Sequence, residues 1–197
     1  MGLLYWQRRY ADMIDLGEEL RFDQPDDEDL LFMLAFAYSA LGDDAEAIGL
    51  LELAGMPGTV LSESRRASEM FADLTLISAL QAVGRNDEAL ELARFSLQIS
   101  QRLMATEGHS GWAPAWKAAC VKAVLGDDAA ALLMLESLPT LGTLAWLPLL
   151  RDQACFRRFG QEPRYLAVVD ALEARTAALR ERLPATLARH GLALPTD

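Results

Sequence analysis

The chain has 197 residues, of which 52% are hydrophobic and 8% aromatic, and its formal net charge is −11. Such an acidic chain is a poor partner for a nucleic-acid backbone or an anionic membrane surface. The longest apolar run spans residues 30–41, whereas a membrane-spanning helix needs about 18 apolar residues or more. Ala and Leu dominate, and no stretch alternates between apolar and polar residues, so the sequence predicts a helical protein with a packed core. Its charge and the short apolar run predict neither a nucleic-acid nor a membrane partner.

The first predicted hairpin is incomplete. Residues 3–8 resemble the end of a helix, and a second apolar pattern covers residues 10–22 before Pro25. The helix before residue 10 is therefore much shorter than its partner. We expect from this that the chain begins inside a longer protein, and a natural start on a half-repeat is the alternative.

Four carboxylates at residues 26–29 precede the next predicted helix, residues 28–41, and a further helix is predicted at 44–55. Carboxylates at a helix N-terminus interact favourably with unpaired amides and with the positive end of the helix dipole. An acidic quartet also resembles half of a metal site, but the sequence holds no second ligand cluster. Helix capping is the favoured interpretation, and no metal is predicted.

Periodic apolar patterns predict further helices at 65–83, 87–105, 112–125 and 128–138. Proline and glycine residues after this point leave room for one or two short helices within 144–159. A long final helix begins at Pro163 and extends to about Leu183, where Pro184 ends or kinks it.

Three glycines, Gly42, Gly84 and Gly126, recur at a period of 42 residues. Each ends an apolar run and is followed within two residues by Asp or Asn. Glycine accepts the left-handed conformation that closes a helix, and Asp or Asn can cap the next one, so the pattern predicts stacked helical hairpins. We expect a partial repeat at 1–25, full repeats at 26–57, 64–105 and 111–139, and a C-terminal helical cap and tail at 140–197.

The predicted hairpins resemble the tetratricopeptide repeat (TPR), whose signature is W-x2-L-G-x2-Y…A-x3-F…P. The residues that carry the resemblance are Leu31, Leu34, Ala35, Tyr38, Gly42, Ala47, Leu51, Ala54 and Pro57. Later repeats depart from the signature, with Ala93 at the large-residue position and Lys122 in place of Tyr. The resemblance implies an all-α, TPR-like superhelix of about three full hairpins, with a partial N-terminal hairpin and a C-terminal helical cap.

Residues 146–172 carry a second, looser resemblance, to the ending of TPR regions in multi-domain bacterial signalling proteins. Its residues include Trp146, Leu150, Arg151, Phe156, Phe159, Pro163 and Tyr165. Such regions commonly follow a winged-helix DNA-binding domain or a nucleotide cyclase domain, neither of which is found in this sequence. This resemblance implies a regulatory context and no activity.

In TPR proteins the first helix of each hairpin lines a concave groove. Carried over to this chain, the resemblance implies a partner-binding groove formed by Phe32, Met33, Phe36, Phe71, Leu74, Ser78, Trp116 and Lys117. The TPR clamp for C-terminal carboxylates uses Lys, Arg and Asn at these positions, and only Lys117 qualifies. We therefore expect a groove for a protein or peptide partner, unless neighbouring hairpins, the chain's own C-terminal helix or upstream repeats cover these side chains.

Charge is distributed unevenly along the chain. Residues 151–197 hold eight arginines against six carboxylates, whereas the preceding residues are strongly acidic. Arg157, Arg158 and Arg164 could form a small basic patch. In a chain of this net charge, we interpret them as solvated helix surface.

Nothing in the sequence predicts an enzyme, a cofactor or a metal. His109 and His190 lie in a predicted loop and tail, with no periodic carboxylate beside either, and no phosphate-binding or hydrolase motif occurs. Cys120 and Cys155 form no CxxC pattern and predict neither a disulfide framework nor a zinc site. A reducing compartment, and so a cytoplasmic location, is expected.

The sequence supports two hypotheses of function. The first is a non-enzymatic interaction or sensory scaffold module within a larger bacterial regulatory or signalling protein. The second is a stand-alone TPR-type export chaperone or assembly factor that binds an apolar client segment. Both imply a protein or peptide partner, and the N-terminal edge around Tyr5 and Trp6 would allow a homo-oligomer.

Overall fold

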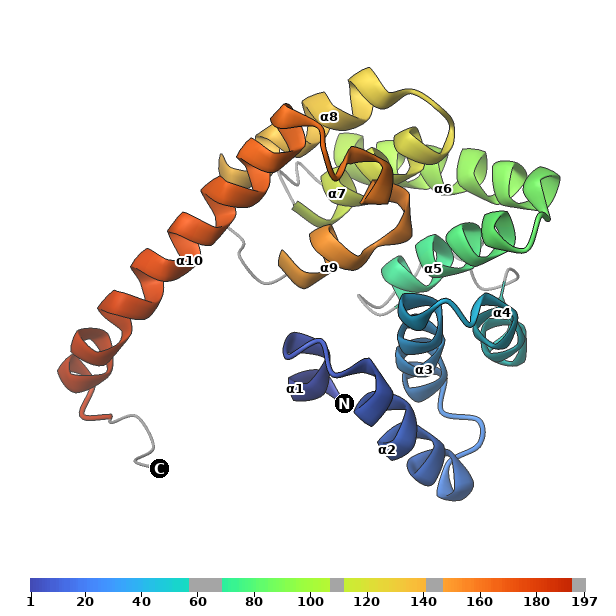
Figure 1. Cartoon of the computed structure of the whole chain (residues 1–197), viewed down its shortest axis with the longest axis horizontal. Coiled ribbons are helices and arrows are strands. Elements are labelled where there is room, and N and C mark those ends of the chain that lie inside the picture. Colours follow the sequence, from blue (N-terminus) through green and yellow to red (C-terminus); the bar gives the residue numbers. More distant parts are fainter. Residues whose placement is uncertain (57–68, 107–111, 141–146, 193–197) are drawn as a thin grey trace.

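The structure, a computed structural model, describes residues 1–56, 69–106, 112–140 and 147–192, and every regular element in these ranges is a helix (Figure 1). The α-helices are α1 (Gly2–Trp6), α2 (Tyr10–Asp23), α3 (Glu28–Leu41), α4 (Asp44–Leu53), α5 (Glu69–Ala82), α6 (Asn86–Thr106), α7 (Trp112–Val124), α8 (Asp128–Ser137), α9 (Leu147–Asp152) and α10 (Pro163–Arg189). Two 3-10 helices, η2 (Leu138–Thr140) and η3 (Ala154–Phe159), flank α9.

The helices pair into antiparallel hairpins that stack along an arc. Helix α3 packs on α4, α5 on α6 and α7 on α8, and each hairpin packs on the next through α4–α5 and α6–α7. In Figure 1, α10 starts beside α8 and runs away from the stacked hairpins. This is the predicted all-α superhelix of TPR-like hairpins. Within the described ranges, no helix combines the length and the apolar character that crossing a membrane requires.

The recurrent glycines end helices as predicted. Gly42, Gly84 and Gly126 have φ angles of 93°, 83° and 81°, in the left-handed region. At each, the following amide donates to a carbonyl in the last turn of the helix, as in Asp43 N to Tyr38 O at 2.9 Å. This arrangement satisfies carbonyls that the helix end would otherwise leave unpaired.

The predicted acidic caps form at some helix starts and not at others. The Asp27 carboxylate accepts a hydrogen bond from the Leu30 amide at 3.0 Å, and Asp127 accepts one from the Ala130 amide at 3.3 Å. Asp43 stands at the corresponding position before α4 and makes no side-chain cap hydrogen bond. Capping of α3 therefore uses one carboxylate of the quartet at 26–29.

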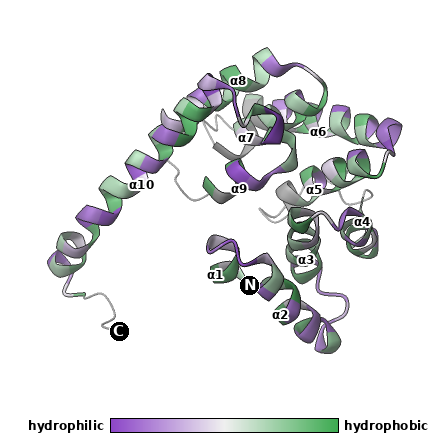
Figure 2. Cartoon of the chain, in the orientation of Figure 1, coloured by the Kyte–Doolittle hydropathy of each residue, from purple (hydrophilic) through white to green (hydrophobic). Residues whose placement is uncertain are grey.

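The last helix is longer than the sequence suggested. Helix α10 continues through Pro184 to Arg189, so Pro184 does not end the helix, and the alternative of a kink at Pro184 stays a prediction. Proline removes one backbone donor, which leaves the Arg180 carbonyl without its usual partner within the helix. This part of α10 is exposed, so water can satisfy that carbonyl, and Figure 2 shows hydrophilic and hydrophobic residues alternating along it.

Two helical glycines give a matched test of the packing. A Cβ at Gly17 in α2 would lie 2.5 Å from Leu34 Cδ2, inside the α2–α3 contact, whereas a Cβ at Gly49 in α4 would meet nothing within 4 Å. We expect Gly17→Ala to lower the free energy of unfolding by about 1–3 kcal/mol through overpacking. We expect Gly49→Ala to raise it by about 0.5–1 kcal/mol, because alanine favours helix.

Urea denaturation of both variants, followed by circular dichroism, checks this expectation. If Gly17→Ala left the midpoint unchanged or raised it, the close approach of α2 to α3 at Gly17 would be incorrect.

Candidate partner-binding surfaces

The structure places most of the predicted groove residues in the core. Phe32, Leu74, Ser78, Trp116 and Lys117 are each at most 6% exposed. Met33 and Phe36 are partly buried against that core, and the Phe71 side chain lies outside the described residues. The five buried side chains are not surface groups, so the expected open groove is corrected at these positions.

The chain itself covers the groove. The Phe36 ring packs edge-on against Tyr5 and Tyr10, with ring centroids 5.4 and 5.9 Å apart. The Trp116 ring packs against Phe156 of η3, with centroids 6.0 Å apart. The short first hairpin and the C-terminal cap thus fill the inner side of α3 and α7. A Trp116→Ala variant would therefore test folding and not partner binding.

Lys117 is buried because it neutralises a buried carboxylate. Its Nζ lies 2.5 Å from Asp73 Oδ2, and the two side chains are 2% and 0% exposed. The Ser96 hydroxyl donates to the same carboxylate oxygen at 2.6 Å. The pair links α5, α6 and α7. Asp73, inside the apolar run of α5, is the sequence signal that points to a buried cation, since lone carboxylates are seldom buried.

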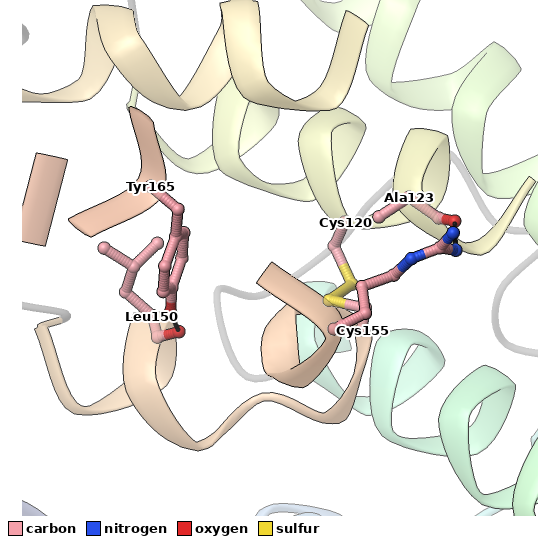
Figure 3. Close-up of a disulfide and its surroundings, with 6 residues drawn as sticks. Cys120, Ala123, Leu150, Cys155 and Tyr165 are labelled. Carbon is pink, nitrogen blue, oxygen red and sulfur yellow. Dashed lines mark hydrogen bonds between the residues drawn. A yellow bond between two sulfur atoms is a disulfide. The ribbon is translucent and has the colours of Figure 1, made fainter. Parts of the chain in front are cut away.

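The two cysteines form a disulfide, contrary to the prediction. Cys120 of α7 and Cys155 of η3 are joined, with Cα atoms 5.6 Å apart (Figure 3). The bond ties the C-terminal cap to the last hairpin. Their sequence separation of 35 residues gave no pairing signal, because only the tertiary fold shows which Cβ atoms meet.

Near the disulfide, one hydrogen bond joins two parts of the cap and another joins the cap to α7 (Figure 3). The Tyr165 hydroxyl donates to the Leu150 carbonyl at 2.5 Å, and burial raises the pKa of Tyr165 to about 12, so the phenol stays a neutral donor. Arg158 donates to the Ala123 carbonyl at 3.0 Å. Arg158 therefore holds η3 on α7. The interpretation of this residue as solvated helix surface, made from the sequence, misses this structural role.

The N-terminal hairpin is joined to the cap through Asp152. Arg8 Nε donates to Asp152 Oδ2 at 2.8 Å, and a second guanidinium nitrogen of Arg8 donates to Oδ1. The Tyr10 hydroxyl donates to Oδ2 at 2.5 Å, and burial, together with this carboxylate, raises the pKa of Tyr10 well above its ordinary value. Arg8 holds a left-handed backbone, with φ of 57°, a conformation that costs a non-glycine residue about 1–3 kcal/mol.

A cleft lies between the N-terminal hairpin, the C-terminal end of α3 and the C-terminal cap. It consists of two neighbouring cavities, one of about 820 Å³ that Arg157 lines and one of about 360 Å³ that Arg180 lines, and Arg8 and Arg151 line both. We call it the inner cleft, and its lining residues are Trp6, Gln7, Arg8, Tyr10, Ala40, Leu41, Gly42, Leu147, Arg151, Asp152, Arg157, Glu173, Thr176, Ala177 and Arg180.

The inner cleft is cationic although the chain is acidic. Its lining holds four arginines and two carboxylates. Arg8 is paired with Asp152 and Arg151 with Glu173. For Arg157 and Arg180, no carboxylate of the described residues lies within ion-pair distance. The Trp6 side chain, 45% exposed, adds an aromatic surface at the edge.

The stacked hairpins define a TPR-like helical repeat protein. The fold is similar to the TPR-like repeats of a kinesin light chain-like protein from Podosopora anserina, at 20% identity and a TM-score of 0.49, over 89% of this chain and 91% of that one. It is also similar to MamA, at 14% identity and a TM-score of 0.41, over 89% and 95% of the two chains. At these values the likeness carries no argument about function, and the fold rests on the hairpins themselves. No protein-family model and no curated protein matches the chain.

Proposed function

We propose that the chain is a non-enzymatic scaffold that binds a protein segment in the inner cleft. The observation that carries this proposal is the pair Arg157 and Arg180, which face a cleft in an acidic chain without a carboxylate partner among the described residues. The larger cavity, about 820 Å³, lies within the usual range of binding sites. In the smaller cavity, Trp6 and Leu147 supply the apolar contact that a peptide side chain requires.

The chemistry of the cleft supports binding and not catalysis. Both oxygens of Asp152 already accept hydrogen bonds from Arg8, and one also accepts from Tyr10. Glu173 is paired with Arg151. A general base needs a carboxylate or imidazole that can reach a substrate proton, and both carboxylates of the lining are already engaged.

The context that we propose for this scaffold is a regulatory or signalling protein of bacteria, on the resemblance of residues 146–172 to the end of such TPR regions. A stand-alone export chaperone or assembly factor is the alternative. It is favoured by large apolar side chains on the surface, among them Leu3 and Phe22, which are 70% and 90% exposed. Mapping the translation start of the gene distinguishes the two.

The compartment stays a prediction. A cytoplasmic location was expected from cysteines without a pairing pattern, and the Cys120–Cys155 bond removes that argument. Disulfides persist mainly in oxidising compartments. Thiol titration of the protein from its native cells, after rapid alkylation, shows whether the bond forms there, and cell fractionation shows the compartment.

Reversing the two cleft arginines should remove partner binding. We expect Arg157→Glu/Arg180→Glu to lower partner capture by about tenfold or more, because both substitutions place like charge where the segment's carboxylates bind. The matched control is Arg182→Glu/Arg189→Glu, which makes the same charge change on exposed positions of α10 outside the cleft.

Capture by the immobilised chain from a lysate of its native cells, quantified by mass spectrometry, measures the effect, and circular dichroism verifies folding. Equal capture by wild type and the cleft variant would refute the proposal. An equal loss in the control variant would do so too, because the loss would then reflect net charge.

A further inference from the structure

The connection between α2 and α3 forms an exposed acidic tip, which we define as residues 22–29. Each of these residues is exposed, and the segment holds five carboxylates and no basic residue. Phe22, at 90% exposed, is the most exposed large apolar side chain among the described residues. Asp27 caps α3. This structural role explains one of the five carboxylates but does not explain why the Phe22 ring is exposed.

The acidic tip and the inner cleft are complementary in charge and in chemistry. Arg157 and Arg180 offer two guanidinium groups to carboxylates, and charge-assisted arginine–carboxylate hydrogen bonds are among the strongest in proteins. In the smaller cavity, beside Arg180, Trp6 and Leu147 give an apolar surface on which a phenylalanine ring can pack in an edge-on or offset arrangement.

One copy of the chain does not place its own tip in its own cleft. Tyr10, which lines the cleft, begins α2, and Asp23 ends this helix of 14 residues, so the two ends lie about 20 Å apart at the α-helical rise. Figure 1 shows the α2–α3 connection at the end of α2 that points away from α9 and α10. A tip that fills the cleft must therefore come from another molecule.

We propose that the segment bound in the inner cleft is the acidic tip of a second copy of this chain. The proposal rests on the function proposed above and names its partner. Because the two contacting surfaces differ, the association is head-to-tail and can extend to further copies or close into a ring. An acidic segment of another protein has similar chemistry, and the experiment below separates the two.

Sedimentation equilibrium of the full chain tests the proposal. We expect the wild type to associate with increasing concentration. The cleft variant Arg157→Glu/Arg180→Glu and the tip variant Phe22→Ser/Asp26→Arg should each weaken association by about tenfold or more. A control that changes an exposed apolar residue and a carboxylate elsewhere, Leu133→Ser/Asp87→Arg, should associate like the wild type.

Mixing the two defective variants gives the sharpest result. The cleft variant keeps an intact tip and the tip variant keeps an intact cleft, so an equimolar mixture should form a one-to-one complex and nothing larger. A fluorescently labelled peptide of residues 21–30 provides a measurement that needs no substitution in the tip. Its anisotropy should rise with wild-type chain and stay low with the cleft variant.

A wild type that stays monomeric to high micromolar concentration, together with no peptide binding, would overturn the proposal. If such a monomer still captured a foreign partner through Arg157 and Arg180, the proposed function would stand and only the identity of the segment would be wrong. If neither association nor capture depended on these arginines, the proposed function and the proposed identity of the segment would both be wrong. Loss of association in the Leu133→Ser/Asp87→Arg control would also overturn the head-to-tail contact.

Discussion

Replacing Lys117 by methionine is expected to lower the free energy of unfolding by about 3–5 kcal/mol, the usual cost of removing one partner of a buried ion pair. The Lys117 ammonium lies 2.5 Å from Asp73 Oδ2 and is 2% exposed. Methionine has nearly the same length, so the packing of the stem is kept while the charge is lost. Urea denaturation monitored by circular dichroism measures the effect.

Two further variants separate charge from packing. Lys117→Met/Asp73→Leu removes both charges and should recover most of the lost stability, because exchanging a whole buried pair for apolar groups is often neutral. The recovery is incomplete because Ser96 loses the carboxylate to which it donates. Lys122→Met, on the same helix, removes a cation that pairs with the half-exposed Asp127 and should cost less than about 1 kcal/mol. If Lys117→Met cost no more than Lys122→Met, the pair would not be buried as described.

The helices and their turns could be predicted because their signals are local. Apolar periodicity and the acidic run before it predicted a helix over 28–41, and α3 is Glu28–Leu41. The glycine after it takes the left-handed conformation that the sequence required. A helix stop depends on residues within one turn of each other, so the printed sequence contains the whole signal.

The candidate site could not be predicted because its contacts are long-range. Arg8 and Asp152 are 144 residues apart. They meet only because the arc of hairpins brings the connection between α1 and α2 close to the C-terminal cap. Tyr5 covers Phe36 from 31 residues away, through the packing of α1 on α2 and of α2 on α3. The TPR resemblance left open whether the groove is exposed or covered, and in this chain Tyr5 and Phe156 cover it at Phe36 and Trp116.

Reduction of the Cys120–Cys155 bond is expected to lower the free energy of unfolding by about 4 kcal/mol, the loop-entropy value for a loop of this length. The two residues are 35 apart in sequence, and the bond restricts the unfolded chain by closing that loop. Comparing urea denaturation with and without reductant measures the effect. The variant Cys120→Ala/Cys155→Ala should match the reduced wild type to within about 1 kcal/mol, with a small extra loss from the buried sulfur atoms, and should not respond to reductant.

Reduction should also weaken partner binding, because Cys155 lies two residues before Arg157 on η3 and Arg157 lines the inner cleft. The cap would stay docked through Arg158, which donates to the Ala123 carbonyl, and through Phe156, whose ring packs on Trp116, so the expected change is a looser cleft and not a lost fold. Binding of the labelled tip peptide to the oxidised chain, the reduced chain and the alanine variant tests this. Two titratable thiols in the unreduced native protein, together with a reductant-independent urea midpoint, would show that the bond does not form.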